Sequence, residues 1–98
     1  MTREEIAEIN DEALLLDGFD DAIIGVAERP NIGPIVAYDE DKIIEILFNQ
    51  MELDNIENMS EDDIENEKYI MAIEYYDYNI RNAWLGEYTP IYIKKTLY

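Results

Sequence analysis

The chain has 98 residues, with 24 Asp and Glu against 7 Lys and Arg, which gives a net charge of −17 at pH 7. It contains no His and no Cys, which excludes disulfides, thiolate nucleophiles, sulfur-bound zinc and histidine-based triads. Hydrophobic residues make up 48% of the sequence, so we expect a folded acidic domain spanning residues 1–98. The start of the chain is acidic and the apolar runs are short, which favours a cytoplasmic protein with no membrane contact.

The first expected element is a short helix or helix pair. Thr2 and Glu5 have the spacing of a capping box, and Ile6, Ile9 and Ala13 follow at helical spacing. We expect this helical segment to run to about Leu16 and to end before Gly18.

A β-hairpin is predicted next, over residues 21–38. Residues 21–28 and 34–38 are rich in β-branched side chains, although Gly25 weakens the first strand or marks a close approach. The segment Arg29-Pro30-Asn31-Ile32-Gly33 between them is typical of a turn, because Asn and Gly tolerate positive φ.

Two further helices are expected. Asp39 is a predicted N-cap for a mostly buried helix that continues to Met51. Ser60 and Asp63 predict the start of a long helix, over residues 60–85, with Met59 and Ile64 placed for a hydrophobic staple. Gly86 is the expected stop. One face of this helix carries apolar residues at alternating spacings of four and three: Tyr69, Ile73, Tyr76, Ile80 and Ala83. We expect Tyr76 and Ile80 to be buried.

Residues 88–94 alternate and predict a last strand, which Pro90 confines to a sheet edge or to a strand start. The predicted fold class is therefore α+β. We expect a small antiparallel sheet, made of the hairpin and the C-terminal edge strand, packed by two or three helices.

Several segments resemble a family of small accessory proteins of tailed bacteriophages. They are Leu16-Asp17-Gly18-Phe19-Asp20-Asp21-Ala22-Ile23-Ile24-Gly25-Val26, Val36-Ala37-Tyr38-Asp39-Glu40-Asp41-Lys42, Tyr75-Tyr76-Asp77-Tyr78-Asn79 and Ala83-Trp84-Leu85-Gly86-Glu87-Tyr88-Thr89-Pro90-Ile91. The resemblance covers about residues 13–93 and implies a phage origin, but the family has no assigned activity. This chain departs from the pattern by its extra acids and Asn between Leu53 and Glu67.

Those extra acids form the first candidate site, a partner-binding acidic face. Its seven members, which have no basic residue among them, are Asp54, Glu57, Glu61, Asp62, Asp63, Glu65 and Glu67. Helical carboxylates can imitate the closely spaced phosphates of a nucleic acid and compete for proteins that bind one. The alternative is a solvated face that only confers solubility.

The second candidate is a ligand-binding cluster of Tyr75, Tyr78, Arg81 and Trp84, in which rings could stack on a base and Arg81 or Arg29 could meet a phosphate. Core packing is the competing explanation for these aromatics. Asp17, Asp20 and Asp21 could bind a hard cation, but their spacing is not that of an EF-hand, so turn chemistry is the preferred interpretation. With 24 acids, chance carboxylate pairs are unavoidable and indicate no catalytic site.

These considerations favour a phage-encoded, non-catalytic binding protein without a metal or cofactor. We expect it to act in the host cytoplasm as a DNA-mimic or anti-CRISPR-like decoy. Its expected partner is the basic surface of a host or antiviral-defence protein that binds nucleic acid, and direct nucleic-acid binding is not expected at a charge of −17. The alternatives are a nucleotide-sequestering module, which uses the aromatic cluster, and a structural or assembly protein. A homodimer remains open.

Overall fold

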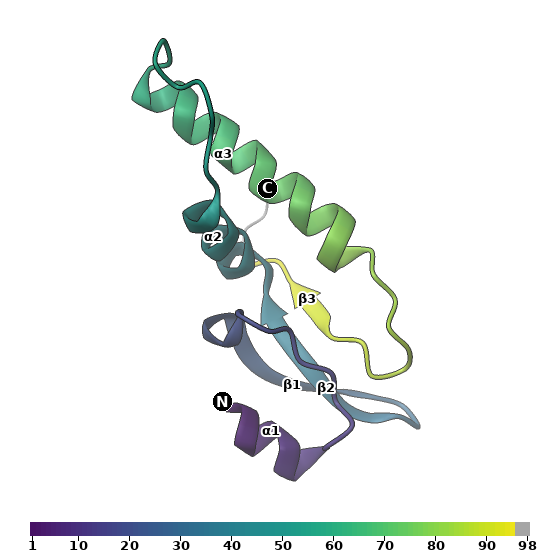
Figure 1. Ribbon diagram of the computed structural model, residues 1–98. Helices are drawn as coiled ribbons and strands as arrows, with labels where there is room; N and C mark the ends of the chain where they lie inside the picture. Colours follow the sequence, from purple (N-terminus) through teal and green to yellow (C-terminus); the bar gives the residue numbers. More distant parts are fainter. Residues whose placement is uncertain (96–98) are drawn as a thin grey trace. The chain divides into compact units, whose positions relative to one another are not determined.

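The computed structural model describes residues 1–95, which form two compact units. Among these residues, the sheet unit comprises residues 1–43 and 84–95, and the helical unit comprises residues 44–83. Both units are coloured by sequence in Figure 1. Residues 1–95 contain three strands and three α-helices, so the predicted α+β class is confirmed.

The sheet unit is built on a three-stranded sheet of order β1-β2-β3 (Figure 1). Its strands are β1 (Ile23–Arg29), β2 (Gly33–Asp39) and β3 (Ile91–Ile93). The predicted hairpin is confirmed, with β1 antiparallel to β2 and a turn in which Asn31 and Gly33 have positive φ. A register shift between Ile23 and Gly25 marks a β-bulge, and a Cβ at Gly25 would meet nothing within 4 Å. Gly25 therefore adjoins a bulge, and no close approach requires it.

The third strand corrects one detail of the prediction, because β3 runs parallel to β2 and the sheet is mixed. Between these strands the chain forms helices, and such a long connection allows two parallel neighbours, whereas a tight hairpin does not. Pro90 directly precedes β3, as expected of a residue without a backbone donor. The central strand β2 is buried continuously from Ile35 to Tyr38.

Helix α1 (Arg3–Ile9) has the predicted capping box, since the Thr2 side chain accepts from the Glu5 backbone N–H and the Glu5 side chain accepts from that of Thr2. The helix ends at Ile9, earlier than the predicted Leu16. Asn10 ends it, because its backbone is extended and its side-chain amide donates to Pro34 O at 2.8 Å, which ties this point of the chain to β2. A 3₁₀ turn, η1 (Asp20–Ala22), leads into β1.

Helix α2 (Glu40–Gln50) begins where Asp39 accepts from the Lys42 backbone N–H, so the predicted N-cap is confirmed. Helix α3 (Glu61–Tyr76) continues into a π-helical turn, η2 (Asp77–Arg81), and the two together span 21 residues. The predicted end at Leu85 is wrong, because the π turn closes the helix at Arg81. Gly86, the expected stop, lies beyond it in a turn, with φ of 106°.

Candidate binding surface

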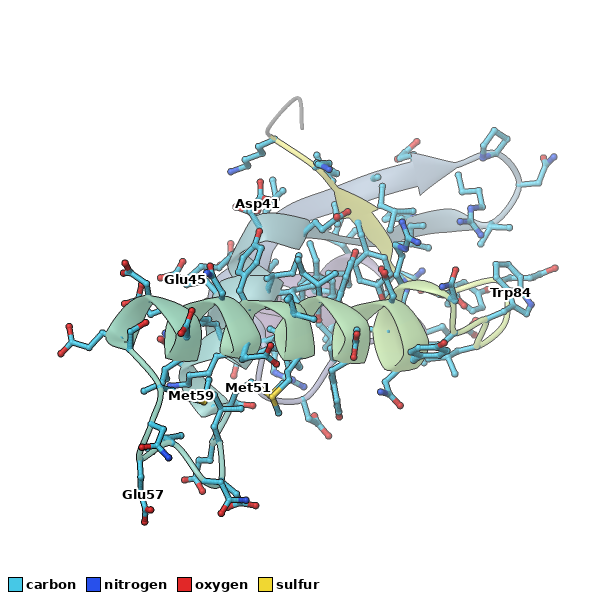
Figure 2. All side chains as sticks on the ribbon, turned by 90° about the horizontal axis from the view of Figure 1, so that it is seen from above. Asp41, Glu45, Met51, Glu57, Met59 and Trp84 are labelled. Carbon is cyan, nitrogen blue, oxygen red and sulfur yellow. The ribbon has the colours of Figure 1, made fainter. Side chains whose placement is uncertain are left out.

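The seven acids predicted as a binding face, called the acidic set below, all belong to the helical unit and are all exposed. Asp54 and Glu57 lie in the loop of residues 51–60, and the other five lie in the first two turns of α3. Figure 2 shows Glu57 at the end of this loop, pointing away from α3. The structure therefore brings the acidic set to one end of the helical unit.

The five helical acids surround the start of α3 rather than forming a single stripe. At 3.6 residues per turn, Glu61 and Glu65 lie one above the other, as do Asp63 and Glu67, and the five acids cover roughly 240° of the helix circumference. The remaining arc contains Ile64 and Lys68, which are partly buried. Carboxylates, together with the exposed Asn66, thus make up the exposed side of these two turns.

The spacing of these charges along the helix axis is close to that of duplex DNA. Residues 61–67 span about 9 Å of axis at a rise of 1.5 Å per residue, and five carboxylates lie within that length. A DNA duplex has one charge per about 1.7 Å of axis, or about five charges in the same length. A basic surface that accepts a nucleic acid would meet a similar linear charge density here.

Within residues 1–95, none of the acidic set takes part in an ion pair. The two cations of the helical unit are engaged elsewhere. Arg81 pairs with Asp77 at 3.1 Å, and the Lys68 ammonium lies 5.3 Å from the centre of the Phe48 ring. The negative charge at this end is therefore not neutralised within the unit.

A helix cap positions the acidic set. The Ser60 hydroxyl accepts from the Asp63 backbone N–H at 3.1 Å, as the sequence predicts, and the first turn contains Glu61, Asp62 and Asp63. Acids in a first turn interact favourably with the helix dipole, which offsets part of their mutual repulsion. The start of α3 can therefore hold this charge density while it remains folded.

The second predicted cluster is only partly assembled. Tyr75 and Tyr78 line a hollow of about 300 Å³ within the helical unit, together with Met51, Met71, Glu74 and Asn79. Arg81 does not line this hollow and pairs with Asp77. Trp84 belongs to the sheet unit, where the Arg29 guanidinium lies 5.8 Å from the centre of its ring. The two arginines considered for a phosphate thus each have a partner.

The aspartates considered for a cation have a different role in the structure. The Arg3 guanidinium contacts Asp20 at 2.8 Å and Asp17 at 3.3 Å, and it also donates to Leu16 O. The hydrogen bond from Arg3 to Asp20 raises the pKa of Arg3. Among residues 1–95, no group of three acids is arranged to hold a metal ion. Asp17 and Asp20 fasten the 10–22 segment to α1 through Arg3.

Sequence reasoning missed two structural groups of the sheet unit. The Thr89 hydroxyl, 5% exposed as a residue, accepts from Leu85 N at 2.8 Å and donates to Gly86 O at 2.6 Å, so it shapes the turn before β3. The Tyr38 hydroxyl accepts from Leu16 N at 2.8 Å, and its ring stacks on Tyr92 at 6.2 Å. The Thr89 and Tyr38 hydroxyls each bond to positions that follow no helical or strand period, so the periodicity of the sequence does not predict these hydrogen bonds.

Comparisons with protein-family models, with curated proteins and with solved structures found no match. In the part of the chain that the structure describes, no helix combines the length and the apolar character needed to cross a membrane.

Proposed function

We propose that this protein is a non-catalytic acidic binding protein of bacteriophage origin. It acts in the host cell by docking the acidic set on the basic, nucleic-acid-binding surface of a host or antiviral-defence protein, which it inhibits. The observation that carries the proposal is that seven exposed carboxylates gather at one end of the helical unit and none has an ion-pair partner within residues 1–95. Folding does not require such a density, because like charges repel in the compact state.

The geometry favours this function over nucleotide sequestration. A nucleotide site needs a cation beside its aromatic rings, whereas the charged residue that lines the hollow is Glu74. A carboxylate there would repel a phosphate. Direct binding to DNA or RNA is disfavoured for the same electrostatic reason, at a net charge of −17.

The test begins with capture of partners on the immobilised protein from the lysate of infected bacteria. A captured protein supports the proposal if it binds DNA or RNA by itself and if this protein competes with that nucleic acid for it. The complex should weaken steeply between about 0.1 and 0.5 M salt, because its contacts are between charges.

Charge variants then locate the contact. Glu61→Gln, Asp62→Asn, Asp63→Asn and Glu65→Gln remove four charges with little change of volume. A triple variant retains Asp63, the residue whose backbone N–H donates to the Ser60 hydroxyl. Partner affinity should fall by about 2–5 kcal/mol in both variants, as for charges paired across an interface. The matched control is Glu8→Gln, Asp11→Asn and Glu28→Gln, three exposed acids of the sheet unit. Equal losses of partner affinity in the control and the triple variant would show that binding depends on the net charge of the protein and not on the acidic set.

A further inference from the structure

One face of α3 and η2 carries a methionine, two tyrosines and one carboxylate. Met71, Glu74, Tyr75 and Tyr78 follow each other at the i, i+3, i+4 and i+7 positions of one helix face. Met51, from the loop after α2, lies with them around the hollow of about 300 Å³. Tyr75 is 48% exposed and Tyr78 is 84% exposed, so both rings remain accessible.

The chemistry of this hollow suits a cation with an aliphatic stem. Tyrosine rings attract a cation through their negative faces, and methionine side chains adapt to an irregular apolar stem. Glu74 is exposed and makes no ion pair within residues 1–95, and no Lys or Arg lines the hollow. A guanidinium would meet a carboxylate and two rings here, whereas an anion would meet repulsion.

The backbone beside the hollow is held in an uncommon conformation. The π turn of Asp77–Arg81 follows directly after Tyr76. The Asn79 side-chain amide donates to Tyr75 O at 3.1 Å, and that of Asn82 donates to Asp77 O at 2.8 Å, so side chains satisfy two carbonyls at the widened turn. Single π turns in helices are frequent at functional sites. Local hydrogen bonds thus fix the backbone from which Tyr75 and Tyr78 project.

We propose that this hollow is a second contact site, which takes a single arginine side chain of the basic partner. The arginine stem lies on Met51 and Met71, and its guanidinium meets Glu74 and the rings of Tyr75 and Tyr78. A planar guanidinium stacks on aromatic rings better than a lysine ammonium does. The inference rests on the proposed function, which supplies a basic partner, but it uses residues outside the acidic set.

The four methionines make the test specific. Met51 and Met71 line the hollow, Met59 adjoins the Ser60 cap at the acidic set, and Met1 lies in the sheet unit. Protein labelled with ¹³C at the methionine methyl groups is titrated, at about 0.15 M salt, with a blocked glycine–serine peptide that has one central arginine. The resonances of Met51 and Met71 should shift and saturate, and that of Met1 should not move. The same peptide with citrulline, which is neutral and nearly isosteric, should leave Met51 and Met71 unshifted.

Two variants identify the groups that hold the cation. Glu74→Gln and Tyr78→Leu should each raise the Kd of the arginine peptide by about three-fold, the effect of losing one exposed charge or ring contact. Both positions are exposed, and circular dichroism checks that the variants fold. Glu8→Gln, an exposed acid of α1, changes the net charge equally and should leave the Kd unchanged.

Three outcomes would overturn the inference: unmoved Met51 and Met71, equal shifts with citrulline, or a Glu74→Gln variant that binds like the parent. A shift of Met59 alone would also overturn it, while the proposed docking of the acidic set would stand. If the acidic-set variants still bind the captured partner and Glu74→Gln does not, the hollow is the contact and the proposed function of the acidic set fails.

Discussion

The two units of this protein use their charged residues differently. In the sheet unit, Arg3 and Lys95 are paired with acids at points that organise the fold. Arg3 joins α1 to Asp17 and Asp20, and Lys95 meets Asp39 at 3.3 Å, beside the start of α2. In the helical unit, eleven acids accompany two cations, and the acidic set is left without an ion pair within residues 1–95.

This difference separates charges that support folding from charges that oppose it. Removing a carboxylate that is paired with Arg3 deletes a stabilising ion pair. Removing one member of the acidic set, in contrast, relieves repulsion between like charges. Deletion of the charges paired with Arg3 should therefore weaken the sheet unit, and deletion of members of the acidic set should strengthen the helical unit. The presence of residues that oppose folding favours the interpretation that the acidic set serves in binding.

The largest expected effect tests the core of the helical unit. Tyr76 is 1% exposed and Tyr78 is 84% exposed, although they lie two residues apart. Tyr76→Ala should lower the free energy of unfolding by about 3–5 kcal/mol, because it leaves a large cavity. Tyr78→Ala should change it by less than about 0.5 kcal/mol, as for other exposed positions. Urea unfolding of the pair measures both, and similar values for the two would contradict the assigned burial.

The second prediction concerns alkaline pH and the sheet unit. Burial raises the pKa of Tyr92 to about 12, with a further contribution from Tyr38, and burial also raises the pKa of Tyr38. A raised pKa means that the folded state prefers the protonated phenol. Its contribution is complete below about pH 10, the unfolded pKa, and is lost as the pH rises towards 12.

Stability should therefore fall between pH 10 and 12, by about 1–2 kcal/mol for Tyr92, a figure reduced because its ring is partly exposed. Urea unfolding at intervals of pH measures the fall. Tyr92→Phe should flatten it, and Tyr78→Phe, at an exposed position, should not. A fall of the same size in Tyr92→Phe would assign it to another group.

The third prediction compares the two arginine sites. Arg3→Ala removes contacts to Asp20, Asp17 and Leu16 O, and we expect a clear loss of melting temperature. Arg81→Ala removes one half-exposed i,i+4 pair with Asp77 and should cost about 0.3–0.5 kcal/mol. Thermal unfolding of both variants ranks them, and a larger effect at Arg81 would reverse the comparison between the units.

The sequence predicts those structural features that are determined by residues close together in the chain. The caps at Thr2, Asp39 and Ser60, the turn at Asn31 and Gly33, and the burial of Tyr76 and Ile80 all follow from spacing or side-chain chemistry within a few positions, and all are confirmed. The same holds for the exposure of the acidic set, because charged residues at the start of a helix remain solvated.

Features that depend on distant residues were not predictable in this way. Asn10 ends α1 by donating to Pro34 O, which lies 24 residues away in the chain. Strand β3 runs parallel to β2, and the alternation of residues in a strand does not specify this direction. The periodic apolar face of the long helix is not buried along its whole length, since Tyr69, its first member, is 51% exposed. The hollow combines Met51 with α3 residues twenty or more positions away, so only the fold shows that Tyr75 and Tyr78 share a site without Arg81 or Trp84.

The smallest expected effect bears most directly on the acidic set. If its charges oppose folding, added salt should stabilise the protein, because the Debye length falls from about 30 Å at 0.01 M to about 10 Å at 0.1 M. The triple variant Glu61→Gln, Asp62→Asn and Glu65→Gln should raise the free energy of unfolding by a few tenths of a kcal/mol at low salt, since each removed charge had like-charged neighbours. The same variant should also gain less stability from added salt than the parent.

The sheet-unit control, Glu8→Gln, Asp11→Asn and Glu28→Gln, removes the same charge and should keep more of the salt dependence. Urea unfolding of the parent and of both variants at the two salt concentrations gives the six free energies of unfolding that the comparison needs. A triple variant that is destabilised at low salt would mean that these acids support the start of α3 through the helix dipole more than they repel one another, and the case that they are retained for binding would weaken accordingly.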